Sequence, residues 1–136
     1  MINNLTSEAV ARSVEAFAAS IRKSQIIFIP GGFSGGDEPD GSGKFITAFF
    51  RNAEITDAVA DLLDSRDGLM AGICNGFQAL VKLGLVPYGR ITETDADSAT
   101  LTFNEIRRHQ SKLVRTRVAS NKSPCISMKI ISSLRS

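Results

Sequence analysis

Cys74 is the residue whose neighbours in the sequence most clearly indicate chemistry. Gly72 and Gly76 lie two residues before and after it, which makes the stretch AGICNGFQ a G-x-C-x-G pattern. This is the cysteine form of a nucleophile elbow, a sharp strand-to-helix turn that holds its nucleophile in a strained backbone conformation. A free cysteine between apolar segments is more often a small buried hydrophobic residue. The spacing alone leaves both interpretations open.

The segment after Cys74 would activate such a nucleophile. Residues 75–83 have apolar side chains at helical spacing, so the thiol is expected to face a helix N-terminus, where the helix dipole favours the thiolate. The backbone N–H of Asn75 is then placed to donate a hydrogen bond to an oxyanion. Together these features predict a nucleophile and one oxyanion donor.

The glycine-rich stretch GGFSGGDEPDGSGK, residues 31–44, is a second candidate site. A phosphate-binding P-loop would require a glycine where the sequence has Glu38, and Ser or Thr where it has Phe45. The dinucleotide pattern G-x-G-x-x-G does not fit either, so phosphate binding is disfavoured. Glycine leaves its backbone accessible to a ligand. The stretch therefore offers backbone N–H donors for an oxyanion, at Gly31, Gly32 and Phe33.

A general base for the nucleophile is harder to find. His109 is the only histidine of the chain, and it lies in the basic run RRHQSKLVRTR, with Glu105 as the one carboxylate near it. A structural histidine, exposed or hydrogen-bonded, is favoured over a general base at this position. Cys125 follows a proline and is expected to be a packing residue.

Length and composition indicate one folded domain. The chain has 136 residues, of which 43% are hydrophobic and 22% charged, and this composition excludes a disordered chain. It shows no export signal and no apolar run long enough for a membrane span, so we expect a cytoplasmic protein with free thiols. The net charge of +2 is small, and the late basic run lacks interleaved aromatics. No nucleic-acid or membrane partner is expected.

Periodicity predicts the elements that would position these residues. Apolar residues at helical spacing predict helices at 7–22, 53–65 and 75–83, with Thr6 or Ser7 and Asn52 as caps. Uncharged apolar runs predict strands at 25–30 and 68–73, and the first has the composition of a strand buried on both faces of a parallel sheet. A short helix is expected to start at FITAFF. Partial alternation predicts two more exposed strands, at 99–104 and 111–120. The order predicts an α/β layer structure with a parallel core.

Two stretches taken together resemble the triad-type, class I glutamine amidotransferases: FIPGGFSGGDEPDGSGKF at 28–45 and GLMAGICNGFQALVKLGLVPYG at 68–89. They are most similar to the C-terminal glutaminase domain of phosphoribosylformylglycinamidine synthase of the large single-chain type. The resemblance covers about residues 3–124 and implies a flavodoxin-like α/β fold with an incomplete parallel sheet. It predicts a single partial domain over 1–136, with 125–136 as a divergent tail.

The resemblance implies a glutaminase that supplies ammonia for purine biosynthesis. The family's cysteine attacks glutamine, and the ammonia passes to a synthetase region that amidinates formylglycinamide ribonucleotide with ATP and Mg²⁺. No cofactor or metal is implied on this chain itself. Carried over residue by residue, the family's roles make Cys74 the nucleophile, Gly32 and the Asn75 backbone the oxyanion donors, with Phe33 as a weaker addition, and Gln78 a glutamine-binding residue.

The sequence also departs from this family. The family's catalytic histidine and glutamate form an H-x-E arrangement, whereas His109 is followed by Gln110 and Ser111. We therefore expect a fragment truncated at both ends, with little activity of its own, that self-associates or binds its synthetase region. Two alternatives stay open: a thiol hydrolase or glyoxalase of the related cysteine-elbow fold, and a non-catalytic interaction domain. Gln78 and the stretch PGGFS favour the amidotransferase.

Overall fold

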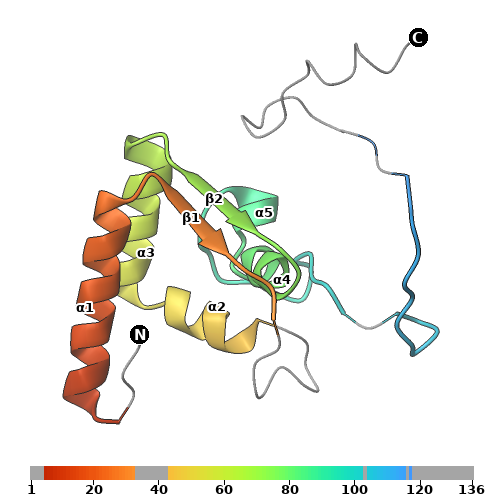
Figure 1. Ribbon diagram of the computed structural model, residues 1–136, viewed down its shortest axis with the longest axis horizontal. Coiled ribbons are helices and arrows are strands. Elements are labelled where there is room, and N and C mark those ends of the chain that lie inside the picture. Colours follow the sequence, from red (N-terminus) through yellow and green to blue (C-terminus); the bar gives the residue numbers. More distant parts are fainter. Residues whose placement is uncertain (1–4, 33–42, 103, 116, 118–136) are drawn as a thin grey trace. The chain divides into compact units, whose positions relative to one another are not determined.

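The computed structural model describes residues 5–32, 43–102, 104–115 and 117, and the chain divides into two units, Met1–Phe103 and Asn104–Ser136. The helices and strands among the described residues all lie in the first unit (Figure 1). In chain order they are α1 (Ser7–Lys23), β1 (Ile26–Ile29), α2 (Lys44–Phe50), α3 (Ala53–Ala60), η1 (Asp61–Ser65), β2 (Leu69–Gly72), α4 (Asn75–Lys82) and α5 (Leu85–Tyr88). The predicted single domain over 1–136 stays a prediction, and the tail 125–136 lies outside the described residues.

Helices α1 and α3 begin where side-chain caps were predicted. Thr6 Oγ1 accepts a hydrogen bond from the backbone N–H of Ala9 at 3.1 Å, at the start of α1. Asn52 Oδ1 accepts one from the backbone N–H of Glu54, also at 3.1 Å, at the start of α3. Each cap satisfies a backbone donor that the first helical turn leaves without a partner. The helix predicted at 53–65 is confirmed, with its last turn, η1, in π-helical geometry.

The two strands form a parallel pair, as predicted. Ile26 lies opposite Leu69 and Ile29 opposite Gly72. The backbone N–H of Ile73 also donates to the carbonyl of Ile29 at 3.1 Å, which continues the pairing beyond β2. Because parallel strands end at the same edge of a sheet, the segments that follow β1 and β2 lie side by side. The fold is therefore α/β, with a small parallel sheet flanked by helices.

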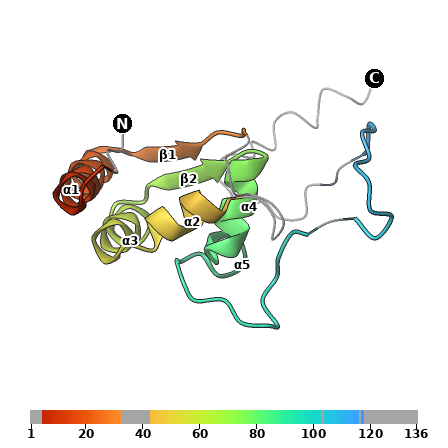
Figure 2. The same cartoon turned by 90° about the horizontal axis from the view of Figure 1, so that it is seen from below.

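The core lies between one face of this sheet and the helices. In Figure 2, α2 and α3 lie on the same side of the two strands. Three phenylalanine rings from α1 and α2 pack edge to face, with ring centroids 5.1 Å apart for Phe17 and Phe49 and 5.9 Å apart for Phe17 and Phe50. The largest fully buried side chains are Ile55, Val59, Leu62 and Leu83. No helix among the described residues is both long and apolar enough to span a membrane.

The prediction that β1 is buried on both faces is wrong. Ile29 is buried, but Ile26 is 59% and Phe28 56% exposed. Successive side chains of a strand point to opposite faces, and the residues that the structure describes cover only the face of Ile27 and Ile29. An uncharged run predicts burial on both faces only when a layer of helices lies on each face.

The two strands predicted at 99–104 and 111–120 are also wrong, for the residues that the structure describes there. Residues 99–102, 104, 111–115 and 117 form no strand, and the remaining ones lie outside the described part. Leu113 and Val114 are exposed, so no apolar face of this segment is buried. Partial alternation yields a strand only when a neighbouring strand supplies hydrogen bonds and a core covers one face.

Between α4 and residue 89 the structure adds one element that periodicity did not predict. Gly84 adopts φ 86°, in the left-handed region, and ends the α4 segment, as its position predicted. The chain then forms α5, a single helical turn that four residues are too short to reveal by apolar spacing.

Candidate active site

Cys74 lies at the joint between β2 and α4. It is the N-cap residue of α4 and has φ 54° and ψ −116°, a backbone conformation that residues other than glycine rarely adopt. Its thiol is free and its side chain exposed, which contradicts the interpretation of Cys74 as a buried hydrophobic residue. Strain of this kind clusters at functional sites. The predicted elbow geometry is present, whereas the role of Cys74 as a nucleophile stays a prediction.

The two glycines that flank Cys74 are required for close packing. Neither Gly72 nor Gly76 has a positive φ. A Cβ atom on Gly72 would lie 2.7 Å from the carbonyl carbon of Gly76, and one on Gly76 would lie 2.8 Å from the carbonyl carbon of Ile29 and clash with its oxygen. The ends of both strands and the first turn of α4 therefore meet without side chains between them, which sets the position of Cys74.

The segment after β1 runs beside the elbow. A Cβ atom on Gly31 would lie 2.9 Å from Cys74 Cβ, and Gly32 adopts φ 138°. The backbone N–H groups of Gly31 and Gly32 have no hydrogen-bond partner within the described residues. They are therefore available to an oxyanion next to the thiol. Phe33, the weaker candidate donor, lies outside the described residues.

The first turn of α4 brings the remaining candidates to the same place. The backbone N–H of Gln78 donates to the carbonyl of Cys74 at 3.0 Å, so Gln78 lies one helical turn beyond the thiol. Its side-chain oxygen Oε1 is buried and has no hydrogen-bond partner among the described residues. Asn75, the residue directly after Cys74, is 5% exposed. The structure thus brings Gly32, Cys74, Asn75 and Gln78 together.

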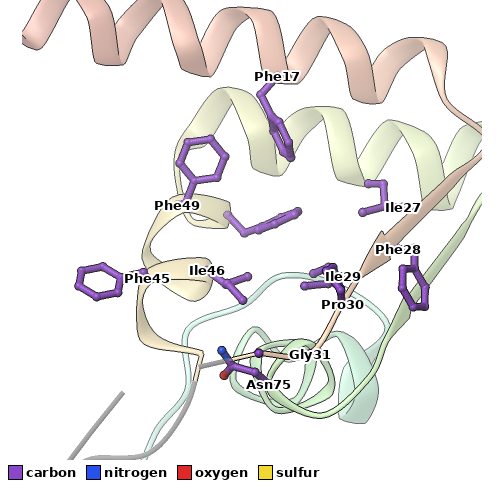
Figure 3. A pocket seen from close by; sticks show the side chains of 12 residues that line it. Phe17, Ile27, Phe28, Ile29, Pro30, Gly31, Phe45, Ile46, Phe49 and Asn75 are labelled. Atoms are coloured by element: carbon purple, nitrogen blue, oxygen red, sulfur yellow. The ribbon is translucent and has the colours of Figure 1, made fainter. Parts of the chain in front are cut away.

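A cavity of about 500 Å³ lies next to this site (Figure 3). It starts at Gly31, Gly32 and Asn75 and extends along β1 toward α1 and α2. Its walls are mostly aromatic and aliphatic, and they include Phe17, Ile27, Ile29, Ile46 and Phe49. Among the described residues that line the cavity, Asn75 has the only polar side chain, so a zwitterionic amino acid such as glutamine finds few partners there.

The described residues around Cys74 show no general base. His109 is exposed and belongs to the second unit, and its assignment as a structural histidine stays a prediction. The described residues also contain no group of three or more His, Cys, Asp or Glu side chains arranged to hold a metal ion. Cys125 lies outside the described residues.

Sequence reasoning missed one feature of the site. It treated Gly31 only as an N–H donor, whereas Gly31 also borders the Cys74 side chain. The signal that was available is the pair of adjacent glycines directly after a strand, because a doubled glycine often marks a close approach of two segments. The pattern does not indicate which segment of the chain comes close.

Comparisons with known proteins agree with this geometry. The model of the CobB/CobQ-like glutamine amidotransferase domain family matches residues 1–135. Three relatives carry the name phosphoribosylformylglycinamidine synthase subunit PurQ. The relative from Dehalococcoides mccartyi is 39% identical over 65% of this chain and 32% of its own length. The one from Treponema denticola is 36% identical over 75% of this chain and 39% of its own length. The one from Moorella thermoacetica is 46% identical over 45% of this chain and 23% of its own length.

The chain spans well under half the length of these curated relatives. The relatives are named as subunits, so the similarity to the large single-chain type in particular stays a prediction. No solved structure gives a significant match.

Proposed function

This chain belongs to the family of CobB/CobQ-like glutamine amidotransferase domains, and we propose that it is the part of a phosphoribosylformylglycinamidine synthase glutaminase that contains the nucleophile. One observation supports this most directly: Cys74, at φ 54° and with an exposed thiol, lies at the start of α4 beside Gly31. The names of the PurQ relatives support the choice of synthase. Membership of this family also weighs against the glyoxalase or general thiol hydrolase that the sequence left open.

The proposed reaction is hydrolysis of the glutamine side-chain amide. The Cys74 thiolate attacks the amide carbon, and the new C–S bond pushes negative charge onto the amide oxygen. The backbone N–H groups of Gly32 and Asn75 donate hydrogen bonds to this oxyanion. The C–N bond then breaks as the nitrogen accepts a proton and leaves as ammonia. Water cleaves the glutamyl thioester, which yields glutamate and restores the thiol.

Gln78 is proposed to bind the glutamine substrate. Its buried Oε1 atom has no partner among the described residues, and a buried acceptor without a hydrogen bond is costly. An N–H group of bound glutamine would satisfy it. Phe33 is proposed as a further oxyanion donor, on the resemblance alone.

The later steps require groups outside this chain. The general base is proposed to come from an H-x-E arrangement, which this sequence does not contain. The ammonia is proposed to pass to a synthetase partner that uses ATP and Mg²⁺ to amidinate formylglycinamide ribonucleotide. We propose no cofactor on this chain itself. Loss of the base removes the proton transfers that general acid–base catalysis supplies, about 10²–10⁴-fold in rate.

The nucleophile is tested by labelling the full chain with a glutamine-analogue electrophile and mapping the adduct by mass spectrometry. The expected result is modification of Cys74 alone, slowed by added L-glutamine. Cys74→Ser is the matched control, because it removes the thiol and keeps the side-chain size. Failure to label the protein, or equal labelling of Cys125, contradicts the assignment and favours a non-catalytic interaction domain.

Turnover tests the incomplete triad. We expect the isolated chain to release ammonia from glutamine at a rate reduced by about 10²-fold or more relative to a complete PurQ subunit assayed in parallel. Turnover comparable to that of the complete subunit would contradict the proposal that the base is missing.

A further inference from the structure

Gly31 borders the reactive side chain itself. A Cβ atom placed on Gly31 would lie 2.9 Å from Cys74 Cβ, 3.6 Å from Cys74 Sγ and 3.4 Å from the carbonyl oxygen of Ile73. Real Cβ atoms are almost never found as close as 2.9 Å to another carbon. The space that a side chain at position 31 would occupy is therefore filled by the Cys74 side chain.

The two adjacent glycines are needed for different reasons. Gly32 adopts φ 138°, and a Cβ atom there would meet nothing within 4 Å. Gly31 does not have a positive φ, so its backbone conformation is open to any residue. The requirement for glycine at position 31 is consequently the space next to Cys74, and not the course of the backbone.

Cys74 has little freedom to move away from a larger residue at position 31. Hydrogen bonds hold both sides of the elbow: Ile73 N–H donates to the Ile29 carbonyl at 3.1 Å, and Gly76 N–H donates to the Ile73 carbonyl at 2.9 Å. The Cys74 carbonyl accepts from Gln78 N–H at 3.0 Å. Rotation of the thiol about the Cα–Cβ bond leaves Cβ in place, so with the elbow held in this way a contact with Cys74 Cβ is relieved only by shifting the end of β1.

We propose that Gly31 is a positioning residue for Cys74: because it has no side chain, the end of β1 lies against the Cys74 side chain, and the backbone N–H donors after β1 lie next to the thiol. The proposal rests on the proposed function, in which Cys74 is the nucleophile. Gly31 does not touch substrate in this role and acts only through Cys74. A residue larger than glycine moves the end of β1, and with it these N–H donors, away from the sulfur.

The first test measures the reactivity of Cys74 without requiring turnover. The full chain and its Gly31→Ala variant are alkylated with iodoacetamide, and the Cys74 peptide is quantified over time by mass spectrometry. Native Gly31→Ala is expected to react about tenfold more slowly, because moving the N–H donors away from the sulfur removes hydrogen bonds that stabilise the reactive thiolate. In urea both proteins are expected to react equally. Equal rates in the native state overturn the proposal.

Gly89→Ala is the matched control for this experiment. Gly89 has φ 72°, and a Cβ atom there would meet nothing within 4 Å. The variant therefore strains the backbone far from Cys74 along the chain, and its native alkylation rate is expected to equal that of the unmodified chain. A similar slowing in Gly89→Ala would show that general destabilisation, and not position 31, controls the rate, and would overturn the proposal.

The second test addresses the contact itself and remains decisive if Gly31→Ala folds poorly. Cys74→Gly removes the Cβ atom that an alanine at position 31 would meet. The loss of melting temperature caused by Gly31→Ala is therefore expected to be largely absent in the Cys74→Gly background. If Gly31→Ala lowers the melting temperature by the same amount in both backgrounds, the proposal is overturned. Failure of the glutamine-analogue electrophile to label Cys74, together with slowed iodoacetamide alkylation in Gly31→Ala, would overturn the proposed function and leave the positioning contact intact.

Discussion

Cys74 combines an exposed thiol with a backbone conformation that favours glycine. At φ 54° and ψ −116° its Cβ atom crowds the neighbouring backbone. Such residues cost about 1–3 kcal/mol and persist because surrounding contacts hold them. Here these contacts are the close packing of Gly72 against Gly76 and of Gly76 against Ile29. A protein that needed only a turn at this place would be more stable with glycine, so the cysteine is retained at a cost in stability.

This argument predicts that Cys74→Gly stabilises the fold. Relief of the strain, about 1–3 kcal/mol, exceeds the added chain entropy of glycine, about 0.5–1 kcal/mol. We expect a net gain of about 1 kcal/mol in the free energy of unfolding, measured by urea denaturation. Cys74→Ala is the matched control, because it keeps the Cβ atom and the strain. If Cys74→Gly were no more stable than Cys74→Ala, the backbone at position 74 would not be strained.

At the scale of elements, Arg66 connects the end of η1 to the end of α1. Its Nη1 and Nη2 groups donate to the carbonyls of Ser24 at 2.8 Å and Ile21 at 3.0 Å. Its Nε group donates to Asp61 Oδ2 at 2.8 Å. The last carbonyls of a helix have no partner within the helix, and a cation near them also interacts favourably with the helix dipole. Arg66 thereby holds α1 against the helical segment that leads into β2.

We expect Arg66→Gln to destabilise the protein by about 1–2 kcal/mol, because two charge-assisted hydrogen bonds to α1 are lost and the site is only partly exposed. Arg12→Gln is the matched control: Arg12 pairs with Glu8 at 3.8 Å on the exposed surface of α1, and such pairs contribute about 0–0.5 kcal/mol. Thermal and urea unfolding of both variants measure the difference. If both variants lost the same free energy of unfolding, the hydrogen bonds of Arg66 would add no more stability than an exposed ion pair.

At the scale of the whole molecule, the described sheet leaves one face uncovered. Ile26 and Phe28 point away from the core, and β1 pairs only with β2 among the described residues. An uncharged strand with exposed apolar side chains is a common site of association between chains. Self-association or docking of the synthetase region, both expected from the sequence, would cover this face.

Self-association is therefore expected to depend on this face. Sedimentation velocity over a range of protein concentrations should show species larger than the monomer, and Phe28→Lys should shift the distribution toward monomer. Val86→Lys is the matched control, since Val86 on α5 is 53% exposed and lies outside the sheet. A monodisperse monomer at all concentrations, or equal effects of both variants, would argue against association through β1.

Much of the first unit could be predicted from the sequence because its signals are local. The caps Thr6 and Asn52, the helical spacing in α1 and α3, and the glycines around Cys74 each act over a few residues. The predictions failed where burial depends on distant segments. The same uncharged run that forms β1 could be covered on one face or two, and the alternation near Leu113 needs a partner strand that the described residues do not supply.

The sequence by itself determined α1, α3, α4, the two paired strands and the elbow, because helix caps, apolar periodicity and flanking glycines are decided by neighbours along the chain. The tertiary structure decided the surroundings of Cys74. Parallel pairing of β1 with β2 brings Gly31 within contact of the Cys74 side chain, although the two residues are far apart in the sequence. No local pattern encodes such a contact, because it arises only when the register of the strands aligns their ends.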